Sequence, residues 1–160
     1  MRRREYLAAV TAGTVAGTAG CFWEDGNSKA RLGLVSVSNV YEQPQRFVVH
    51  VEENGEDVLT TEIELDAADS SSNMLQPAYT TLDCEWSTDA GEFTVEIFQF
   101  TEPTDSATVS LPGEPRIDEG TGDCVGVDFR AGSSSFDHIV PQVYSCESYL
   151  DTVELCVEEP

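Results

Sequence analysis

RFVVHVEENGEDVLTTEIEL, residues 46–65, alternates apolar and polar side chains along two runs that meet at Asn54-Gly55. Such alternation is the pattern of a β-strand with one buried face, and Asn-Gly between two runs of this kind is the strongest short-range signal for a tight β-hairpin. The stretch therefore predicts a hairpin with one face in a core. The residues expected on that face are Phe47, Val49, Val51, Leu59, Thr61, Ile63 and Leu65.

Similar short runs follow and precede this hairpin, and loops rich in turn-forming residues separate them. No sustained helical period is present, so the pattern predicts an all-β chain, an antiparallel β-sandwich of about 7–8 strands. The loops expected are 66–80 and 114–123. The other candidate strands are 31–39, 80–86 (with Leu82, Cys84 and Trp86 on one face), 91–100, 107–111, 124–130, 136–144 and 152–158, the last of which also fits a helical turn.

The charge of the chain is unusual, because 30 acidic residues stand against 8 basic ones and give a net charge of −22. Self-repulsion of this size destabilises a compact state at low salt, whereas a Debye length of roughly 3 Å at 1 M salt screens it. Lys29 is the only lysine. This composition resembles that of proteins from salt-loving archaea, and it argues against nucleic acid, a polyanion, as a partner.

Residues 1–20 have the layout of an export signal, with a positive head at Arg2–Arg4 and a short, mildly apolar stretch at 8–19. That stretch is too short to span a membrane by itself. Arg3-Arg4-Glu5-Tyr6-Leu7 resembles the twin-arginine consensus, which directs the export of folded proteins. We therefore expect a cleaved signal peptide at residues 1–20.

Thr18-Ala19-Gly20-Cys21 resembles a lipobox, although Thr18 stands where leucine is usual. The resemblance implies that Cys21 carries a lipid and becomes the new N-terminus. We expect residues 21–30 to be a lipidated N-terminus with a short tether, residues 31–160 to be the domain, and the protein to lie on the outer face of the cell membrane. The alternative is ordinary cleavage nearby, which leaves Cys21 in the core or in a disulfide.

The chain contains 5 cysteines, an odd number for an exported protein. Assigning Cys21 to lipid leaves Cys84, Cys124, Cys146 and Cys156 for two disulfides, as expected outside the cytoplasm. Three connectivities are possible, with a slight preference for Cys84 with Cys124 and Cys146 with Cys156. A zinc site is disfavoured because no close C-x-x-C pair is present.

FVVHVEENGEDVL (47–59) and GEFTVEI (91–97), preceded by a strand and an Asn- and Pro-containing turn, resemble the immunoglobulin-like domains of small exported haloarchaeal lipoproteins. The resemblance covers residues 1 to about 130. It implies an immunoglobulin-like fold and an exported protein, and it implies no particular activity.

Catalytic and metal motifs are weak. His50 is expected to be an ordinary strand residue, and His138 follows Ser133–Ser135 and Asp137 without the G-x-S-x-G of a hydrolase. Both histidines precede Cys146, which does not fit a blue-copper loop. We therefore expect neither an enzyme nor a cofactor. The residues that form the best candidate calcium cluster are Asp118, Glu119 and Asp123, in a loop without EF-hand spacing.

The chain is thus expected to be a non-catalytic binding or structural module at the cell surface. Its partner, a protein or a small molecule, is sought at the loops 66–79 and 112–123, because sandwich loops usually carry recognition. The alternative is a small-molecule or calcium-binding accessory of a transport or electron-transfer system.

Overall fold

The computed structural model describes residues 29–71, 73–117, 122–132, 137–149 and 154–157. Within these residues the regular secondary structure is almost entirely β-strand, as the alternating pattern predicts. The elements are β1 (Arg31–Asn39), β2 (Gln45–Glu53), β3 (Glu56–Leu65), β4 (Ala78–Thr81), β5 (Phe93–Gln99), β6 (Asp105–Leu111), β7 (Cys124–Ala131), β8 (Ile139–Ser145) and the 3-10 helix η1 (Cys146–Tyr149).

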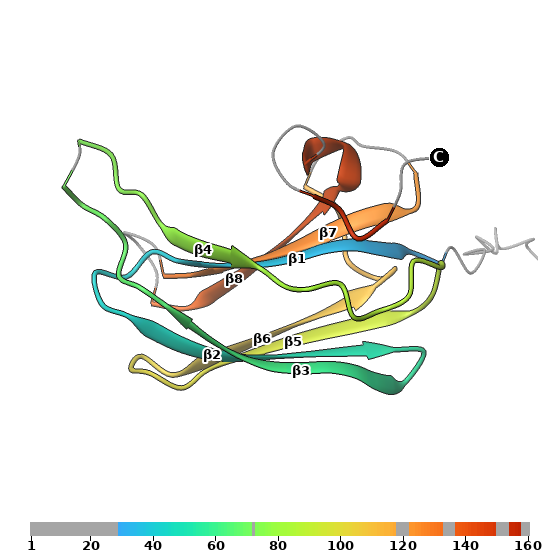
Figure 1. Ribbon diagram of the computed structural model, residues 1–160, viewed down its shortest axis with the longest axis horizontal. Coiled ribbons are helices and arrows are strands. Elements are labelled where there is room, and N and C mark those ends of the chain that lie inside the picture. Colours follow the sequence, from blue (N-terminus) through green and yellow to red (C-terminus); the bar gives the residue numbers. More distant parts are fainter. Residues whose placement is uncertain (1–28, 72, 118–121, 133–136, 150–153, 158–160) are drawn as a thin grey trace, which may run out of the picture.

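Two four-stranded sheets face each other, one in the order β4-β1-β7-β8 and the other in the order β3-β2-β5-β6 (Figure 1). Their inner faces enclose one apolar core, in which Phe47, Phe93 and Phe129 are the largest fully buried side chains. The prediction of an all-β sandwich is confirmed at this level.

The predicted hairpin is present with the predicted faces. Phe47 pairs with Ile63 and Val49 with Thr61 across β2 and β3. Asn54 and Gly55 have φ angles of 52° and 82°. Two consecutive residues with positive φ make the turn that matches the right-handed twist of paired strands, and asparagine and glycine tolerate it best.

One strand pair corrects the antiparallel prediction, because β1 and β7 run parallel. The hairpin rule applies to neighbours in sequence, whereas β1 and β7 are joined through the whole of the opposite sheet. A parallel pair needs such a crossover connection. The direction of this pair therefore follows from the topology of the sandwich and cannot be recognised from a short stretch of sequence.

The chain around β4 also differs from the prediction of a strand at 80–86 and a loop at 66–80. The strand is shorter and begins two residues earlier, at Ala78. Leu82 and Trp86 are buried as predicted, but the chain has left the sheet there, and Cys84 is exposed. Trp86 donates a hydrogen bond of 2.6 Å from Nε1 to the carbonyl oxygen of Leu32, which holds this segment against β1.

Near the C-terminus, β8 begins at Ile139 and extends to Ser145. Residues 154–157 of the last predicted segment have no regular structure, so the strand and helix predictions are both wrong there. Residues 152, 153 and 158 lie outside the described residues.

The two predicted recognition loops lie at opposite ends of the sandwich (Figure 1). The loop before β4 projects at the end where β1 finishes, far from Lys29. The loop before β7 lies beside the start of β1, where the backbone N–H of Arg31 donates to the carbonyl of Asp123. The loop before β4 therefore lies at the end of the sandwich away from Lys29, which we call the distal end.

Candidate functional site

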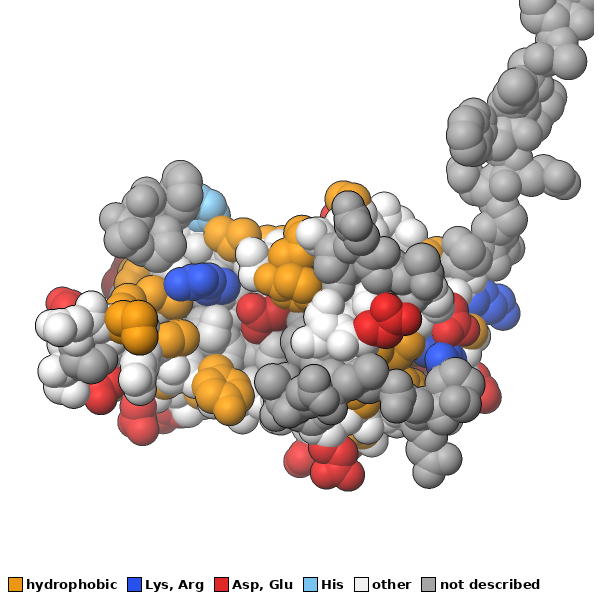
Figure 2. All heavy atoms as spheres, turned by 90° about the horizontal axis from the view of Figure 1, so that it is seen from above, with side chains coloured by type: hydrophobic (Ala, Val, Ile, Leu, Met, Phe, Trp, Pro, Cys, Tyr) orange, Lys and Arg blue, Asp and Glu red, His pale blue; other side chains and the backbone are white. Residues whose placement is uncertain are grey.

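A groove of about 460 Å³ crosses the outer face of the β4-β1-β7-β8 sheet. Figure 2 views the molecule from this side, and hydrophobic side chains there surround acidic and basic ones. The strands β1, β4, β7 and β8 and the helix η1 all contribute residues to the groove. The residues that line it are Ser36, Ser38, Pro77, Tyr79, Asp128, Arg130, Tyr144 and Ser148.

The strand register brings the polar lining residues into rows. Ser36 pairs with Asp128, and Ser38 pairs with Arg130, across β1 and β7. Tyr79 on β4 pairs with Ser38 from the other side. Because side chains alternate along a strand, these residues point away from the core, while Val37 and Phe129, which lie between them, point into it.

Asp128 is the most unusual residue of the groove, since its carboxylate is withdrawn from water on the outer face of a sheet. Burial raises the pKa of Asp128, whereas the hydrogen bond from Ser36 and the positive charge of Arg130 lower it. The Ser36 hydroxyl lies 2.7 Å from Oδ1 and is itself buried. Burying a charge is costly, and titratable groups perturbed in this way concentrate at functional sites.

Two tyrosines stand on either side of this polar floor. Tyr79 on β4 is 68% exposed. Tyr144 on β8 is partly buried, and its hydroxyl donates a hydrogen bond of 2.8 Å to Oε1 of Gln142. Flat aromatic faces beside a carboxylate, serine hydroxyls and a guanidinium can hold a small ligand that has both apolar C–H faces and hydroxyl groups.

A second hollow, of about 550 Å³, lies at the distal end of the sandwich. Tyr41 lines it with Leu75 of the loop before β4, and three carboxylates surround them. Burial and the nearby Asp137 carboxylate raise the pKa of Tyr41. The loop that the sequence singled out as a recognition site therefore borders this hollow, with Met74 and Leu75 exposed. The residues that complete its lining are Val40, Glu42, Gln43, Gln45, Glu102, Pro103 and Asp137.

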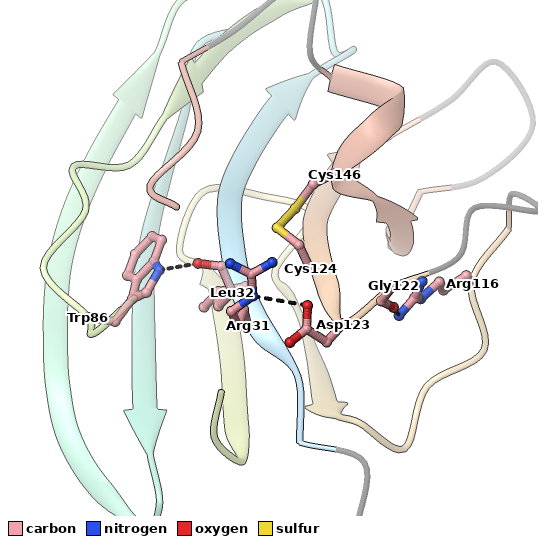
Figure 3. The surroundings of a disulfide bond; sticks show 8 residues. All are labelled: Arg31, Leu32, Trp86, Arg116, Gly122, Asp123, Cys124 and Cys146. Carbon is pink, nitrogen blue, oxygen red and sulfur yellow. Dashed lines mark hydrogen bonds and ion pairs between the residues drawn. A yellow bond between two sulfur atoms is a disulfide. The ribbon is translucent and has the colours of Figure 1, made fainter. Parts of the chain in front are cut away.

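The four cysteines of the domain form two disulfides, as predicted, but with a different pairing from the one preferred. Cys84 is bonded to Cys156, and Cys124 is bonded to Cys146 (Figure 3). The second bond continues the β7–β8 ladder, because Val125 pairs with Ser145 and the cysteines are the next residues outward. The register of two strands, which the spacing of cysteines does not reveal, decides the connectivity.

These disulfides occupy the thiols that a cysteine-based zinc site or a blue-copper site would need. None of the four cysteines offers a thiolate for a zinc or blue-copper site. His138 is exposed at the start of β8, and the serines before it, Ser133–Ser135, lie outside the described residues.

The candidate calcium cluster is described only at Asp123. Its Oδ1 accepts a hydrogen bond of 2.9 Å from Nε of Arg31, which also makes this an ion pair (Figure 3). Asp118, Glu119 and the lipid-attachment residue Cys21 lie outside the described residues.

Sequence reasoning missed the groove. Ser36, Ser38, Asp128 and Arg130 alternate with apolar residues, which looks like an ordinary solvated strand face. The available signal was an aspartate in the middle of the apolar run CVGVDFR, residues 124–130.

Comparison with protein-family models, curated proteins and solved structures found no match. Within the described residues, no helix is long and apolar enough to cross a membrane.

Proposed function

We propose that this protein is an exported, lipid-anchored binding module of the cell surface, without catalytic activity, whose β-sandwich is of the immunoglobulin-like kind. Its groove on the outer face of the β4-β1-β7-β8 sheet binds a small hydroxyl-rich ligand of the neutral saccharide type. The observation that carries the proposal is the partly buried Asp128, held by Ser36 between two tyrosines.

The chemistry of the groove fits a sugar better than it fits an apolar or an anionic ligand. A carboxylate accepts hydrogen bonds from two neighbouring hydroxyl groups, while serine hydroxyls and a guanidinium supply donors. An exposed ring such as Tyr79 offers a flat face against which the C–H side of a sugar ring stacks. A chain with a net charge of −22 repels anions, so a neutral ligand suits it.

The anchoring part of the proposal rests on the N-terminal sequence. Arg3-Arg4 and the lipobox-like Thr18–Cys21 support export and lipidation, and two disulfides are compatible with an oxidising compartment. A tether that enters at Lys29 leaves the outer sheet face and the distal end accessible.

Ligand binding is tested by titrating the full-length protein, in high salt, with a panel of neutral monosaccharides and linear oligosaccharides, followed by NMR and calorimetry. We expect shifts at β1, β4 and β7, and at least a tenfold loss of affinity in Tyr79→Ala and Asp128→Asn. The matched controls are Phe100→Ala, which removes an exposed ring outside the groove, and Asp89→Asn, which removes an exposed carboxylate. Equal losses in the controls, or no saccharide binding at all, would contradict the proposal.

Anchoring is tested by mass spectrometry of the protein isolated from membranes. We expect a mature chain that begins at a lipidated Cys21, and a Cys21→Ser variant that is released from the membrane. An N-terminus without lipid at any other residue would refute this part.

A further inference from the structure

The outer face of the other sheet carries a second constellation, centred on His50 of β2. Glu52 follows on the same strand, and Asp57 comes from β3. One ligand atom from each of these three residues lies within 4.8 Å of the other two. Glu96 of β5 pairs with His50 in the strand register and completes the group.

The register explains how three strands deliver these side chains to one place. A shift between Val51 and Glu52 puts Asp57 opposite Glu52, close to the turn of the hairpin. Without this shift Val58 would lie opposite Glu52, and the alternation of the strand would turn Asp57 to the other face of the sheet. The bulge thus brings the Asp57 side chain to the same face as His50 and Glu52, and bulges often redirect a side chain in this way near a site.

A carboxylate lies on either side of the imidazole. Nε2 of His50 lies 2.8 Å from Oδ1 of Asp57, and Nδ1 lies 3.7 Å from Oε2 of Glu96. The other oxygen of Glu96 accepts a hydrogen bond of 3.5 Å from the hydroxyl of Thr108 on β6. A carboxylate behind the ring fixes its orientation and makes its other nitrogen a better ligand, which is the usual outer arrangement of a metal-binding histidine.

We propose that His50, Glu52 and Asp57 bind a divalent transition-metal ion of the zinc class, with Glu96 as the residue that positions the ring. In this arrangement Nε2 of His50 and one oxygen of each carboxylate are the ligands. Water or a further ligand would fill the remaining coordination positions of the ion. One imidazole with two carboxylates favours zinc over calcium, which takes oxygen ligands only.

Burial supports this assignment of roles. The side chain of His50 is 22% exposed and that of Glu96 is 34% exposed, so the ring and the carboxylate that positions it are more enclosed than Asp57. The Asp57 side chain is 73% exposed, which leaves the metal side of the ring open to solvent. An ion can therefore enter without any rearrangement of the sheet.

The site is independent of the saccharide groove, because it lies on the opposite sheet. It is also distinct from the acidic loop that contains Asp123, whose carboxylate is paired with Arg31. A negative result for one proposal therefore does not contradict the other.

The test is a titration of the full-length protein with Zn²⁺ alone, in high salt that screens the acidic surface, with Ca²⁺ as competitor. We expect one Zn²⁺ per chain that excess Ca²⁺ does not displace. The acidic groups that lie close to the ring are Glu52 of its own strand, Asp57 of β3 and Glu96 of β5.

Three variants separate the roles. His50→Gln should remove the specific Zn²⁺ site, and Glu96→Gln should weaken it by about 10-fold to 100-fold while the stoichiometry stays at one. His138→Gln, which removes the other histidine of the chain, is the matched control and should bind as the wild type does. A Co²⁺ derivative should lose its visible absorption bands in His50→Gln alone.

Two outcomes would overturn the proposal. Zn²⁺ binding that is equal in His50→Gln and in the wild type would mean that the acidic surface holds the ion diffusely. Displacement of Zn²⁺ by an equal concentration of Ca²⁺ would mean that the site consists of carboxylates only.

Discussion

Ser36 donates a hydrogen bond of 2.7 Å from its hydroxyl to Oδ1 of Asp128, across the parallel pair of β1 and β7. This bond is the main local compensation for a carboxylate that the sheet withdraws from water, since Arg130 is exposed and its attraction is screened. Burial nevertheless dominates, and the pKa of Asp128 stays above its ordinary value. The groove thus contains a carboxylate whose burial makes its charged form less stable in the folded protein than in water.

Asp128→Asn should leave the protein as stable as the wild type, or more stable, at neutral pH. Because the folded-state pKa of Asp128 is raised above the unfolded value of about 3.9, the folded protein binds this proton more tightly. The contribution of Asp128 to stability therefore decreases as pH rises from about 4 through the folded-state pKa. Asparagine removes that decrease and can still accept the hydrogen bond from Ser36.

The measurement is the free energy of unfolding by denaturant at several pH values between 4 and 8, at one high salt concentration. The advantage of Asp128→Asn over the wild type should grow with pH and then level off. Asp89→Asn, at an exposed turn, should show no such trend. A variant that is less stable than the wild type at neutral pH would show that the carboxylate has a structural role.

The fold could be predicted from sequence wherever the information is local. The hairpin of β2 and β3 follows from a period of two and from Asn54-Gly55, so its turn and its buried face were both predicted correctly. The parallel pairing of β1 with β7 depends on which sheet each strand joins. That choice is made by the packing of the whole sandwich, and no short pattern carries it.

The site was harder to predict than the fold for the same reason. Asp128 looks like an outward-facing residue of an acidic strand, and it is Tyr79 of β4 and the segment after β8 that make a groove around it. Likewise Asp57 reaches His50 only because of the register shift after Val51. Candidate residues were visible in the sequence, but their neighbours belong to distant strands.

Gly33→Ala should destabilise the protein by about 1–3 kcal/mol, through overpacking. Gly33 is the residue skipped where the register of β1 and β7 shifts between Leu32 and Leu34. A Cβ added there would lie 2.5 Å from Sγ of Cys146 and 2.7 Å from Sγ of Cys124, and these sulfur atoms are fixed by their bond.

The control for this prediction is the same substitution in a chain without that disulfide. In a Cys124→Ser, Cys146→Ser background the two side chains can turn away, so the cost of Gly33→Ala should shrink. Denaturant unfolding of the four proteins gives the coupling directly. If Gly33→Ala lowers the free energy of unfolding by the same amount in both backgrounds, the strain lies in the backbone of β1 and not in the contact with the disulfide.

Gly55→Ala should destabilise the protein by about 1 kcal/mol without affecting either proposed site. Its φ of 82° is a left-handed conformation, and no atom lies within 4 Å of an added Cβ. The cost is thus purely conformational. Thermal and denaturant unfolding measure it, and unchanged Zn²⁺ and saccharide titrations confirm that the hairpin keeps its register. A neutral result would mean that the turn has another conformation.

Removal of the Cys84–Cys156 disulfide should cost more stability than removal of the Cys124–Cys146 disulfide. The first bond closes a separation of 72 residues and the second a separation of 22. In the chain-entropy model these loops correspond to about 4 and about 3 kcal/mol, respectively, because a longer loop restricts the unfolded chain more. Paired serine variants of each bond, unfolded by denaturant under the same conditions, measure the difference.

The comparison requires the pairing to be as described, so peptide mapping of the unreduced protein accompanies it. Peptides that contain Cys124 and Cys146 should be linked to each other, and reduction should separate them. A link between Cys84 and Cys124 would contradict the described pairing, because the β7–β8 register places Cys124 opposite Cys146. If the mapping agrees but the bond that closes the shorter loop stabilises the protein more, the disulfides act mainly on the folded state. The Cys124–Cys146 bond would then stabilise the protein by fixing the end of β8 and η1 against β7.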